Sequence, residues 1–374
     1  MTDLRTTPLH ALHLERGAKM VPFAGYEMPV QFPMGVMKEH LHTRDKAGLF
    51  DVGHMGQVIV RHPEGHAGAA RAMEALVPVS LLGLGANRQR YGMFTDDRGG
   101  ILDDLMIANR GDHLFVVVNA ACKRDDIAHM RARLTGCTVE EVTDRGLLAL
   151  QGPAAEGVLS ALLPEVAAMR FMDVRVTETE FGPLWISRSG YTGEDGFEIS
   201  VPADRADALA RRLLEDPAVA SIGLGARDSL RLEAGLCLYG HDIDQTTSPV
   251  EAALEWAIQK VRRAGGAREG RFPGADRILA ELSGGATRRR VGLRPEGRAP
   301  MREGTGLFTE DQGGAVVGRV TSGGFGPSVG GPVAMGYVPA ELAVQGTHLY
   351  GEVRGRRLPV RVAPLPFVPA RYKR

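Results

Sequence analysis

Apolar residues recur with a helical period in some parts of the chain and in short strand-like runs in others. The segments predicted as helices are 36–47, 66–77, 119–134, 154–163 and 203–214. The segments predicted as strands are 57–61, 89–95, 101–108, 113–119, 139–150 and 174–187. Helices and strands do not alternate regularly, so the order favours antiparallel α+β layers over a doubly wound parallel sheet.

The pattern changes again in the last third of the chain. Ser248-Pro-Val-Glu251 has the form of a capping box and predicts a helix with an apolar face that runs to Val261. A polar, glycine-rich stretch over 262–270 follows. Beyond it, short apolar runs are separated by Gly or Pro turns, and they predict strands at 290–293, 315–321, 334–337, 348–353 and 358–362. We expect a small β-sandwich or barrel there.

Composition narrows the class of protein. A length of 374 residues predicts two or three domains, and 44% hydrophobic with 24% charged residues is ordinary for a globular protein. The formal net charge of zero gives no indication of nucleic-acid binding, and no apolar run approaches the roughly 20 residues that span a membrane. The three cysteines have no metal-binding spacing and the N-terminus has no signal-peptide pattern. We therefore expect reduced thiols, no metal and a cytoplasmic location.

Two segments in the middle of the chain combine polar residues with rigid elements. In 188–201 a glycine-rich turn leads into a strand on which Glu198 faces away from alternate apolar residues. In 224–244 a short helix carries Arg227 near its start. A strand carboxylate and a helix-start arginine can approach one polar ligand from two sides. Taken singly, Glu198 is also consistent with a position on a solvated strand face. Arg227 alone is also consistent with an ordinary surface position.

Asp103 and Asp104 lie inside the apolar strand predicted at 101–108. Adjacent strand residues face opposite ways, so we expect that the two side chains do not reach the same site. A carboxylate in apolar surroundings needs a partner, and its pKa can shift into a range useful for proton transfer. A pair that only makes backbone hydrogen bonds near a turn remains an equal alternative.

The remaining polar motifs fit structural roles. Glu194-Asp195 lies in a glycine-bounded segment that predicts a turn, and the histidines show no metal-ligand spacing. Gly323–Gly331 is rich in glycine, but strands are predicted on both sides of it and it has no phosphate-loop lysine. A β-turn is the better prediction for that segment.

Eight short motifs nevertheless occur along the chain in a specific order. They are Gly17–Gly25, Leu49–Met55, Gly99–Leu105, Ala149–Pro153, Gly190–Gly196, Ala226–Gly240, Val333–Pro339 and Pro366–Pro369. In this order and spacing the chain resembles, over nearly its whole length, the aminomethyltransferase family of the glycine cleavage system, also called T-protein.

The resemblance implies an α+β fold of three domains, arranged like a cloverleaf around a central folate channel. The implied boundaries are 1–50 with 140–245, then 51–139 with parts of 246–280, and a C-terminal β-barrel-like domain over 281–374. The implied reaction transfers a one-carbon unit from the aminomethyl-carrying lipoyl arm of H-protein to tetrahydrofolate. Its products are 5,10-methylenetetrahydrofolate, ammonia and the dihydrolipoyl arm.

The resemblance also implies roles for single residues. Asp104 matches the acid that acts on the folate nitrogens, Glu198 the carboxylate that binds the pterin, and Arg227 a substrate-binding arginine. A carboxylate suits a pterin edge because it accepts two adjacent N–H groups.

Three tyrosines complete the implied site. Tyr372 matches a C-terminal tyrosine, although this match rests on its position after Pro369. Tyr91 matches a residue that lines the channel, and Tyr191 lies within a matching motif.

Two alternatives stay open within the same fold. One is a folate-dependent demethylase of a small methylated substrate, and the other is a non-catalytic folate-binding protein involved in iron–sulfur assembly. The second is marked by a Lys-Gly-Cys-Tyr motif, whereas 188–196 of this chain lacks the cysteine. A eukaryotic, processed form of the protein would place it in the mitochondrial matrix.

Overall fold

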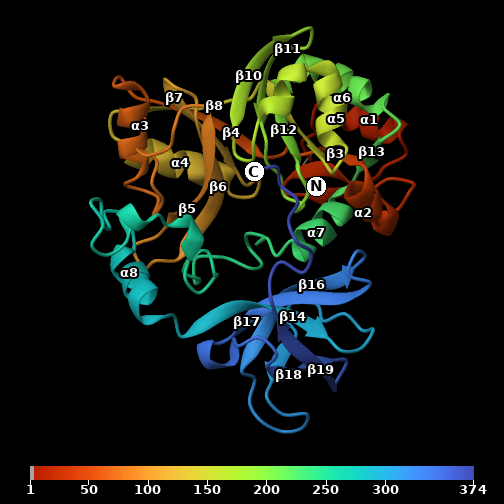
Figure 1. Cartoon of the computed structure of the whole chain (residues 1–374), viewed down its shortest axis with the longest axis vertical. Helices are drawn as coiled ribbons and strands as arrows, with labels where there is room; N and C mark the ends of the chain where they lie inside the picture. The colour runs from red at the N-terminus through yellow and green to blue at the C-terminus, as the bar shows by residue number, and fades with distance from the viewer. Residues whose placement is uncertain (1–3) are drawn as a thin grey trace.

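Three lobes, each built on its own β-structure, surround the centre of the computed structural model, which describes residues 4–374 (Figure 1). Two lobes combine a sheet with helices, and the third is a closed barrel of strands. This arrangement confirms the predicted α+β fold with an all-β C-terminal domain. The sheets do not by themselves define domain boundaries, so the predicted boundaries stay a prediction.

The first lobe contains a six-stranded sheet in the order β10-β11-β12-β9-β3-β13. Its strands are β3 (Ala47–Asp51), β9 (Arg145–Gln151), β10 (Val174–Thr179), β11 (Gly182–Ser187), β12 (Gly196–Pro202) and β13 (Val219–Ile222). Its helices are α1 (His10–Glu15), α2 (Val36–Asp45), α5 (Ala155–Leu162), α6 (Ala206–Leu214) and α7 (Leu224–Glu233), and a hairpin of β1 (Lys19–Phe23) and β2 (Tyr26–Gln31) lies beside them. Neighbouring strands are antiparallel except for β3 and β13.

The apolar pattern explains how this lobe packs. On α6 the buried residues Ala206, Leu209, Ala210 and Leu213 follow the spacing of one helix face. On β12 the buried alternate residues belong to the same core, while Glu198 remains partly exposed on the other face. The predicted orientation of Glu198 is therefore confirmed.

The second lobe contains a five-stranded antiparallel sheet in the order β5-β6-β7-β4-β8. Its strands are β4 (Gly56–Arg61), β5 (Arg88–Thr95), β6 (Ile101–Asn109), β7 (His113–Val118) and β8 (Thr138–Glu141). Helices α3 (Gly65–Met73) and α4 (Lys123–Arg133) cover it (Figure 1). Its core also takes in Cys237, Ile243 and Leu254, so the segment after α7 packs into this lobe.

The third lobe is a barrel closed in the order β14-β17-β16-β15-β18-β19. Its strands are β14 (Arg288–Pro295), β15 (Gly306–Phe308), β16 (Gly318–Gly326), β17 (Gly331–Pro339), β18 (His348–Val353) and β19 (Arg356–Ala363). The sequence did not predict β15, which has three residues and no pattern of its own. The glycine-rich segment at 323–331 forms the ends of β16 and β17 and the turn between them, as predicted.

The prediction of a helix after the capping box was wrong. The box itself forms, because the backbone N–H of Ser248 donates to Glu251 Oε2 at 2.9 Å and that of Glu251 donates to Ser248 Oγ at 3.1 Å. Ala253 then has a φ of +57°, which no α-helix accommodates. Only two three-residue 3₁₀ turns follow before α8 (Ala275–Gly284).

Two predicted strands are each divided in the structure. Residues 139–150 form β8 and β9 in different sheets, and residues 174–187 form the β10–β11 hairpin. None of the helices within residues 4–374 is long and apolar enough to cross a bilayer.

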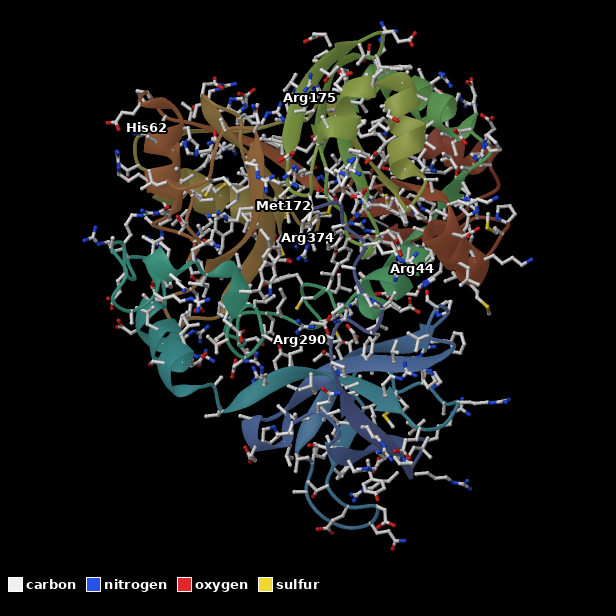
Figure 2. The ribbon with its side chains drawn as sticks, in the orientation of Figure 1. Arg44, His62, Met172, Arg175, Arg290 and Arg374 are labelled. Atoms are coloured by element: carbon white, nitrogen blue, oxygen red, sulfur yellow. The ribbon has the colours of Figure 1, made fainter. Side chains whose placement is uncertain are left out.

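The C-terminal tail returns from the barrel to the centre of the molecule. The backbone N–H groups of Phe367 and Val368 donate to the carbonyl of Glu233, and Arg371 N–H donates to the carbonyl of Gly193. Further on, Phe171 N–H donates to the Lys373 carbonyl at 2.7 Å. Figure 2 shows Arg374 close to the centre, between the two upper lobes. The tail thus ties the barrel to the first lobe.

Candidate active site

Asp104 lies on β6 in the sheet of the second lobe. Burial alternates along β6, so that Asp103 is fully buried and Asp104 is partly exposed. Tyr91 of β5 donates its hydroxyl hydrogen to Asp104 Oδ2 at 3.0 Å, and the exposed Trp256 stacks on the Tyr91 ring at 5.4 Å. Burial, with the neighbouring charge of Asp103, raises the pKa of Asp104 to about 7. A carboxyl group in this state exchanges protons near neutral pH.

One side chain reaches both aspartates of the pair. Asn119 Nδ2 lies 2.9 Å from Asp103 Oδ1 and 2.7 Å from Asp104 Oδ1. The expectation that the two carboxylates do not reach one site was therefore wrong in one respect. Their Cα–Cβ bonds do alternate, but Asn119 stands at the end of β7 and its amide spans both side chains. Nothing in the sequence pattern pointed to Asn119.

Glu198 and Arg227 lie on the other side of the centre, on β12 and α7. Ser189 Oγ donates to Glu198 Oε2 at 3.0 Å. Burial lowers the pKa of Arg227, while the charge of Glu198 raises it. Arg227 Nη1 is buried and has no hydrogen-bond partner within residues 4–374. An unused guanidinium donor near a partly exposed carboxylate fits a polar ligand between them.

The turn before β12 places Tyr191 between these two sides. A side chain at Gly190 would put its Cβ 1.6 Å from Gln151 Oε1, so any other residue there would displace the buried Gln151 amide. The Tyr191 hydroxyl donates to the carbonyl of Cys237, and the Arg227 guanidinium lies 4.9 Å from the Tyr191 ring centre. Burial raises the pKa of Tyr191, and the charge of Asp104 raises it further. Tyr191 is thus electrostatically coupled to both sides.

Tyr372 occupies a different position. Its ring stacks on Phe171 at 4.0 Å, and the charges nearest to its hydroxyl include Arg44 and Glu194. No contact within residues 4–374 joins Tyr372 to Asp104. The structure therefore places Asp104 in contact with Tyr91, and Arg227 in contact with Tyr191 and near Glu198, while the role of Tyr372 stays a prediction.

Two family models match this chain. The model of the GCVT N-terminal domain matches residues 9–262. The model of the glycine cleavage T-protein C-terminal barrel domain matches residues 288–369. The chain belongs to the glycine cleavage T-protein family.

Similar proteins agree with this assignment. The mitochondrial aminomethyltransferase of Homo sapiens is 45% identical over 379 residues, covering 99% of this chain and 91% of that protein. The mitochondrial aminomethyltransferase of Dictyostelium discoideum is 41% identical over 390 residues, covering 100% and 94%. The crystal structure of glycine cleavage system aminomethyltransferase T from Bartonella henselae matches with a TM-score of 0.92 and 45% identity, covering all of both chains.

The present T-protein is therefore an aminomethyltransferase of the glycine cleavage system, and the predicted family and activity are confirmed. Two of these relatives are named as mitochondrial proteins. The cytoplasmic location expected for this chain stays a prediction.

A second polar cluster of this T-protein was missed by the sequence analysis. Arg44 of α2 forms ion pairs with Glu194 at 2.9 Å and with Glu233 of α7 at 3.1 Å. His40 lies 3.0 Å from Glu233, whose other oxygen accepts from the backbone N–H of Ser328 in the β16–β17 turn at 2.8 Å. Glu194 does lie in a turn, as predicted, but it is also a buried ion-pair partner. Its partner Arg44 is 150 positions away, so no local pattern could indicate the pair.

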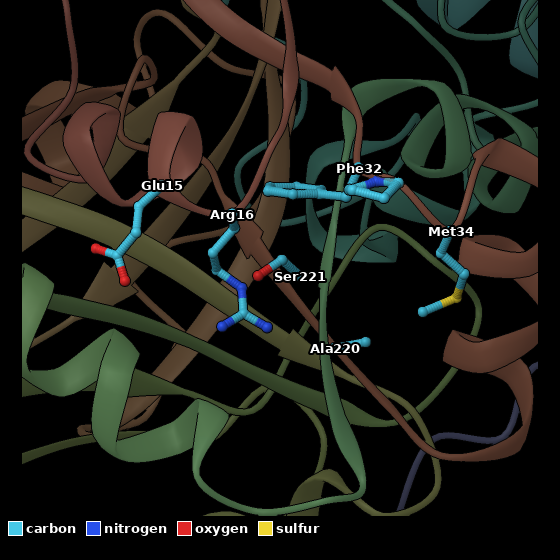
Figure 3. A pocket seen from close by; sticks show the side chains of 7 residues that line it. Glu15, Arg16, Phe32, Met34, Ala220 and Ser221 are labelled. Carbon is cyan, nitrogen blue, oxygen red and sulfur yellow. The ribbon is translucent and has the colours of Figure 1, made fainter.

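A surface pocket elsewhere on the T-protein contains none of the predicted site residues. It is lined by Glu15, Arg16, Phe32, Pro33, Met34, Ala220 and Ser221 (Figure 3). The candidate active site is defined by the convergence of polar residues at the centre of the fold and not by this pocket.

Proposed function

We propose that this aminomethyltransferase takes its one-carbon unit from the aminomethyl group on the lipoyl arm of H-protein and transfers it to tetrahydrofolate. The methylene carbon leaves sulfur and nitrogen and becomes bonded to two folate nitrogens. The two N–H protons of tetrahydrofolate that are lost end on the lipoyl sulfur and on the departing ammonia. The reaction is therefore balanced without an oxidant, a reductant or a metal as reactant.

The observation that carries the proposal is that Tyr91 and Asn119 hold the Asp104 carboxyl group, whose pKa burial raises to about 7, and that its charge acts on Tyr191, which packs against Arg227. Proton transfer at folate nitrogen needs a group whose pKa is close to the operating pH. Asp104 meets this condition, and the hydrogen bonds from Tyr91 and Asn119 fix both of its oxygens.

Glu198 and Arg227 would bind the folate in this proposal. The carboxylate of Glu198 accepts hydrogen bonds from the donor edge of the pterin, as a bidentate acceptor does. The unused Nη1 of Arg227 donates to an acceptor on the substrate. Holding folate beside the incoming lipoyl arm converts an encounter into a step that is close to unimolecular.

The direct test of this proposal is ammonia release from aminomethylated H-protein, measured with and without tetrahydrofolate. We expect strong folate-dependent release, with methylenetetrahydrofolate appearing at the same rate. Folate binding without ammonia release would contradict the proposal. It would favour a demethylase or a non-catalytic folate protein.

The role of Asp104 is tested by Asp104→Asn, which keeps the shape of the side chain and removes the exchangeable proton. General acid–base catalysis contributes roughly 10²–10⁴ in rate, so we expect turnover to fall by about that factor. Folate affinity, measured by calorimetry, should change little. Asp207→Asn on the exposed face of α6 is the matched control and should leave turnover unchanged. Equal losses in turnover and affinity would reduce Asp104 to a binding residue.

A further inference from the structure

Two buried carboxyl groups lie behind Asp104 and have no part in the reaction proposed above. Asp103 of β6 is 0% exposed, and Asp126 in the first turn of α4 is 4% exposed. The two carboxyl groups lie within hydrogen-bonding reach of each other. A hydrogen bond between two carboxyl groups requires that one of them holds a proton.

The contacts around the pair indicate which of the two is protonated. Asp103 accepts hydrogen bonds at both oxygens, from the backbone N–H of Asn119 at 3.0 Å and from Asn119 Nδ2 at 2.9 Å. Asp126 Oδ2 has no partner within residues 4–374. Because N–H groups stabilise an ionised carboxylate, the negative charge belongs on Asp103 and the proton on Asp126.

No cation of the described part of the chain neutralises this group. Within residues 4–374, no Lys, Arg or His nitrogen lies within 4.0 Å of a carboxylate oxygen of Asp103, Asp104 or Asp126. The titratable groups that surround Asp126 are Asp103 and Asp104 on β6, Cys122 and Asp125 beside it in sequence, and Tyr239 from the segment after α7. The adjacent Lys123 is directed elsewhere, and its amine donates to the Tyr26 hydroxyl at 2.6 Å.

A line of neighbouring polar groups connects the pair to the proposed site. It runs from Asp126 to Asp103, from Asp103 to the Asn119 amide, and from that amide to Asp104 Oδ1 at 2.7 Å. The amide NH₂ only donates, so its two hydrogens need an acceptor at each end. Asp103 therefore fixes the orientation in which Asn119 donates to Asp104.

We propose that Asp126 is a positioning residue for the transfer reaction, which in its protonated form keeps Asp103 ionised and so determines how Asp104 is oriented and how tightly Asp104 holds its proton. This inference rests on the proposed role of Asp104. Burial and the charge of Asp103 raise the pKa of Asp126 to about 10, which is consistent with a proton that stays in place at neutral pH. The same charge of Asp103 helps raise the pKa of Asp104.

The proposal distinguishes two substitutions at one position. Asp126→Asn keeps a neutral hydrogen-bond donor of the same shape, whereas Asp126→Leu removes the donor. Without a donor, the buried Asp103 takes up a proton, its charge beside Asp104 is lost, and the pKa of Asp104 falls. The acidic limb of the pH–rate profile then moves to lower pH for Asp126→Leu and stays in place for Asp126→Asn.

The test is the pH profile of single-turnover ammonia release, with saturating tetrahydrofolate and aminomethylated H-protein. For Asp126→Leu we expect the acidic limb to move to lower pH and the plateau rate to fall on the order of tenfold. This loss is a part of the roughly 10²–10⁴ in rate that acid–base catalysis contributes. Asp103→Asn removes the same charge without touching Asp126 and should shift the limb in the same direction. This variant keeps the test available if Asp126→Leu does not fold.

Two results would overturn the inference. An Asp126→Asn profile shifted like that of Asp103→Asn would mean that Asp126 is normally ionised. Unshifted profiles in both Asp126→Leu and Asp103→Asn would mean that the pair has only a structural role. Asp104→Asn is measured alongside, and full turnover in this variant would overturn both the inference and the role proposed for Asp104. If Asp104→Asn loses turnover while the Asp126→Asn profile is shifted, the inference about Asp126 is overturned and the role proposed for Asp104 is not.

Discussion

Two groups of buried carboxylates in this protein differ in their partners. Glu194 and Glu233 are 0% exposed, and both pair with Arg44. The neighbouring His40 holds the pKa of Glu233 down, to about 2, with further help from Ser328 and Arg44 against the opposing effect of burial. Glu233 therefore stays ionised at neutral pH, and the contacts of the two acids connect α2, the turn before β12, α7 and the barrel.

The second group is the buried Asp103 and Asp126 with the partly exposed Asp104, and no cation within residues 4–374 pairs with these three acids. Burial raises the pKa of Asp104 to about 7 and that of Asp126 to about 10. The comparison shows that burial alone does not decide what an acid does. An arginine or histidine partner converts a buried acid into a structural connection, whereas its absence leaves a group that holds and exchanges protons.

The largest expected effect is on the pH dependence of stability, because the pKa of Asp126 is displaced furthest. An acid whose pKa is raised on folding stabilises the folded state fully only below its unfolded value. For Asp126 this contribution is lost as the pH rises from 3.8 towards about 10. Asp126→Asn should therefore lose less stability than the wild type over that window in urea unfolding. Parallel curves for the two proteins would contradict the assignment of the proton to Asp126.

The lowered pKa of Glu233 gives the opposite pH dependence of stability. Its pKa is lowered from 4.5 to about 2, so its contribution is present above 4.5 and is lost as the pH falls through that window. Glu233→Gln should flatten the acidic limb of the stability curve and leave the alkaline limb unchanged. The same urea series measures both variants.

The next largest effect is expected on stability when Arg44, the cation that pairs with Glu194 and Glu233, is removed. Arg44→Met leaves Glu194 and Glu233 buried without it, and breaking a buried pair costs about 3–5 kcal/mol in the free energy of unfolding. The control is Arg71→Met, because Arg71 forms an exposed pair with Glu64 at 2.9 Å. That change should stay within about 0.5 kcal/mol. A similarly small loss for Arg44→Met would contradict the claim that the ion pairs of Arg44 stabilise the fold.

A smaller effect is expected at the ligand-binding carboxylate. Glu198→Ala leaves pterin donors without an acceptor and should weaken tetrahydrofolate binding by about 1–3 kcal/mol. Calorimetry measures this loss, with Glu178→Ala on the exposed side of β10 as the control. Unchanged affinity in the Glu198 variant would rule out its contact with the pterin.

The smallest effect is expected from removing the Ser328 hydroxyl, which also accepts a long hydrogen bond from Arg44 Nε at 3.3 Å. Ser328→Ala removes the hydroxyl that lies 2.8 Å from His40 Nε2 and should lower the free energy of unfolding by about 1 kcal/mol. Turnover should not change. A much larger loss would show that the β16–β17 turn depends on this hydroxyl for its position.

Local patterns predicted the elements that carry the site but not the contacts between them. The alternation on β12 placed Glu198, and the short helix α7 placed Arg227, because each depends on neighbours in sequence. The bridge from Asn119 to two aspartates depends on where β7 ends beside β6. That register is a property of the sheet, and no residue near Asn119 in sequence indicates it.

Tertiary packing also overruled one strong local signal. The capping box at 248–251 forms as its residues dictate, yet the positive φ of Ala253 ends the helix that its apolar spacing predicts. Ala252, Leu254 and Ala257 instead pack into the core of the second lobe. Burial of these side chains in a neighbouring core outweighed the intrinsic preference for a helix.

The most direct test of the comparison is a carbon NMR titration of the carboxyl groups of Asp104 and Glu233 in the wild-type protein, assigned with Asp104→Asn and Glu233→Gln. The account predicts that Asp104 titrates near pH 7 and that Glu233 remains ionised until the pH approaches 2. An Asp104 that titrates close to its ordinary value of 3.8 would contradict the account, because it would then hold no proton to exchange at neutral pH.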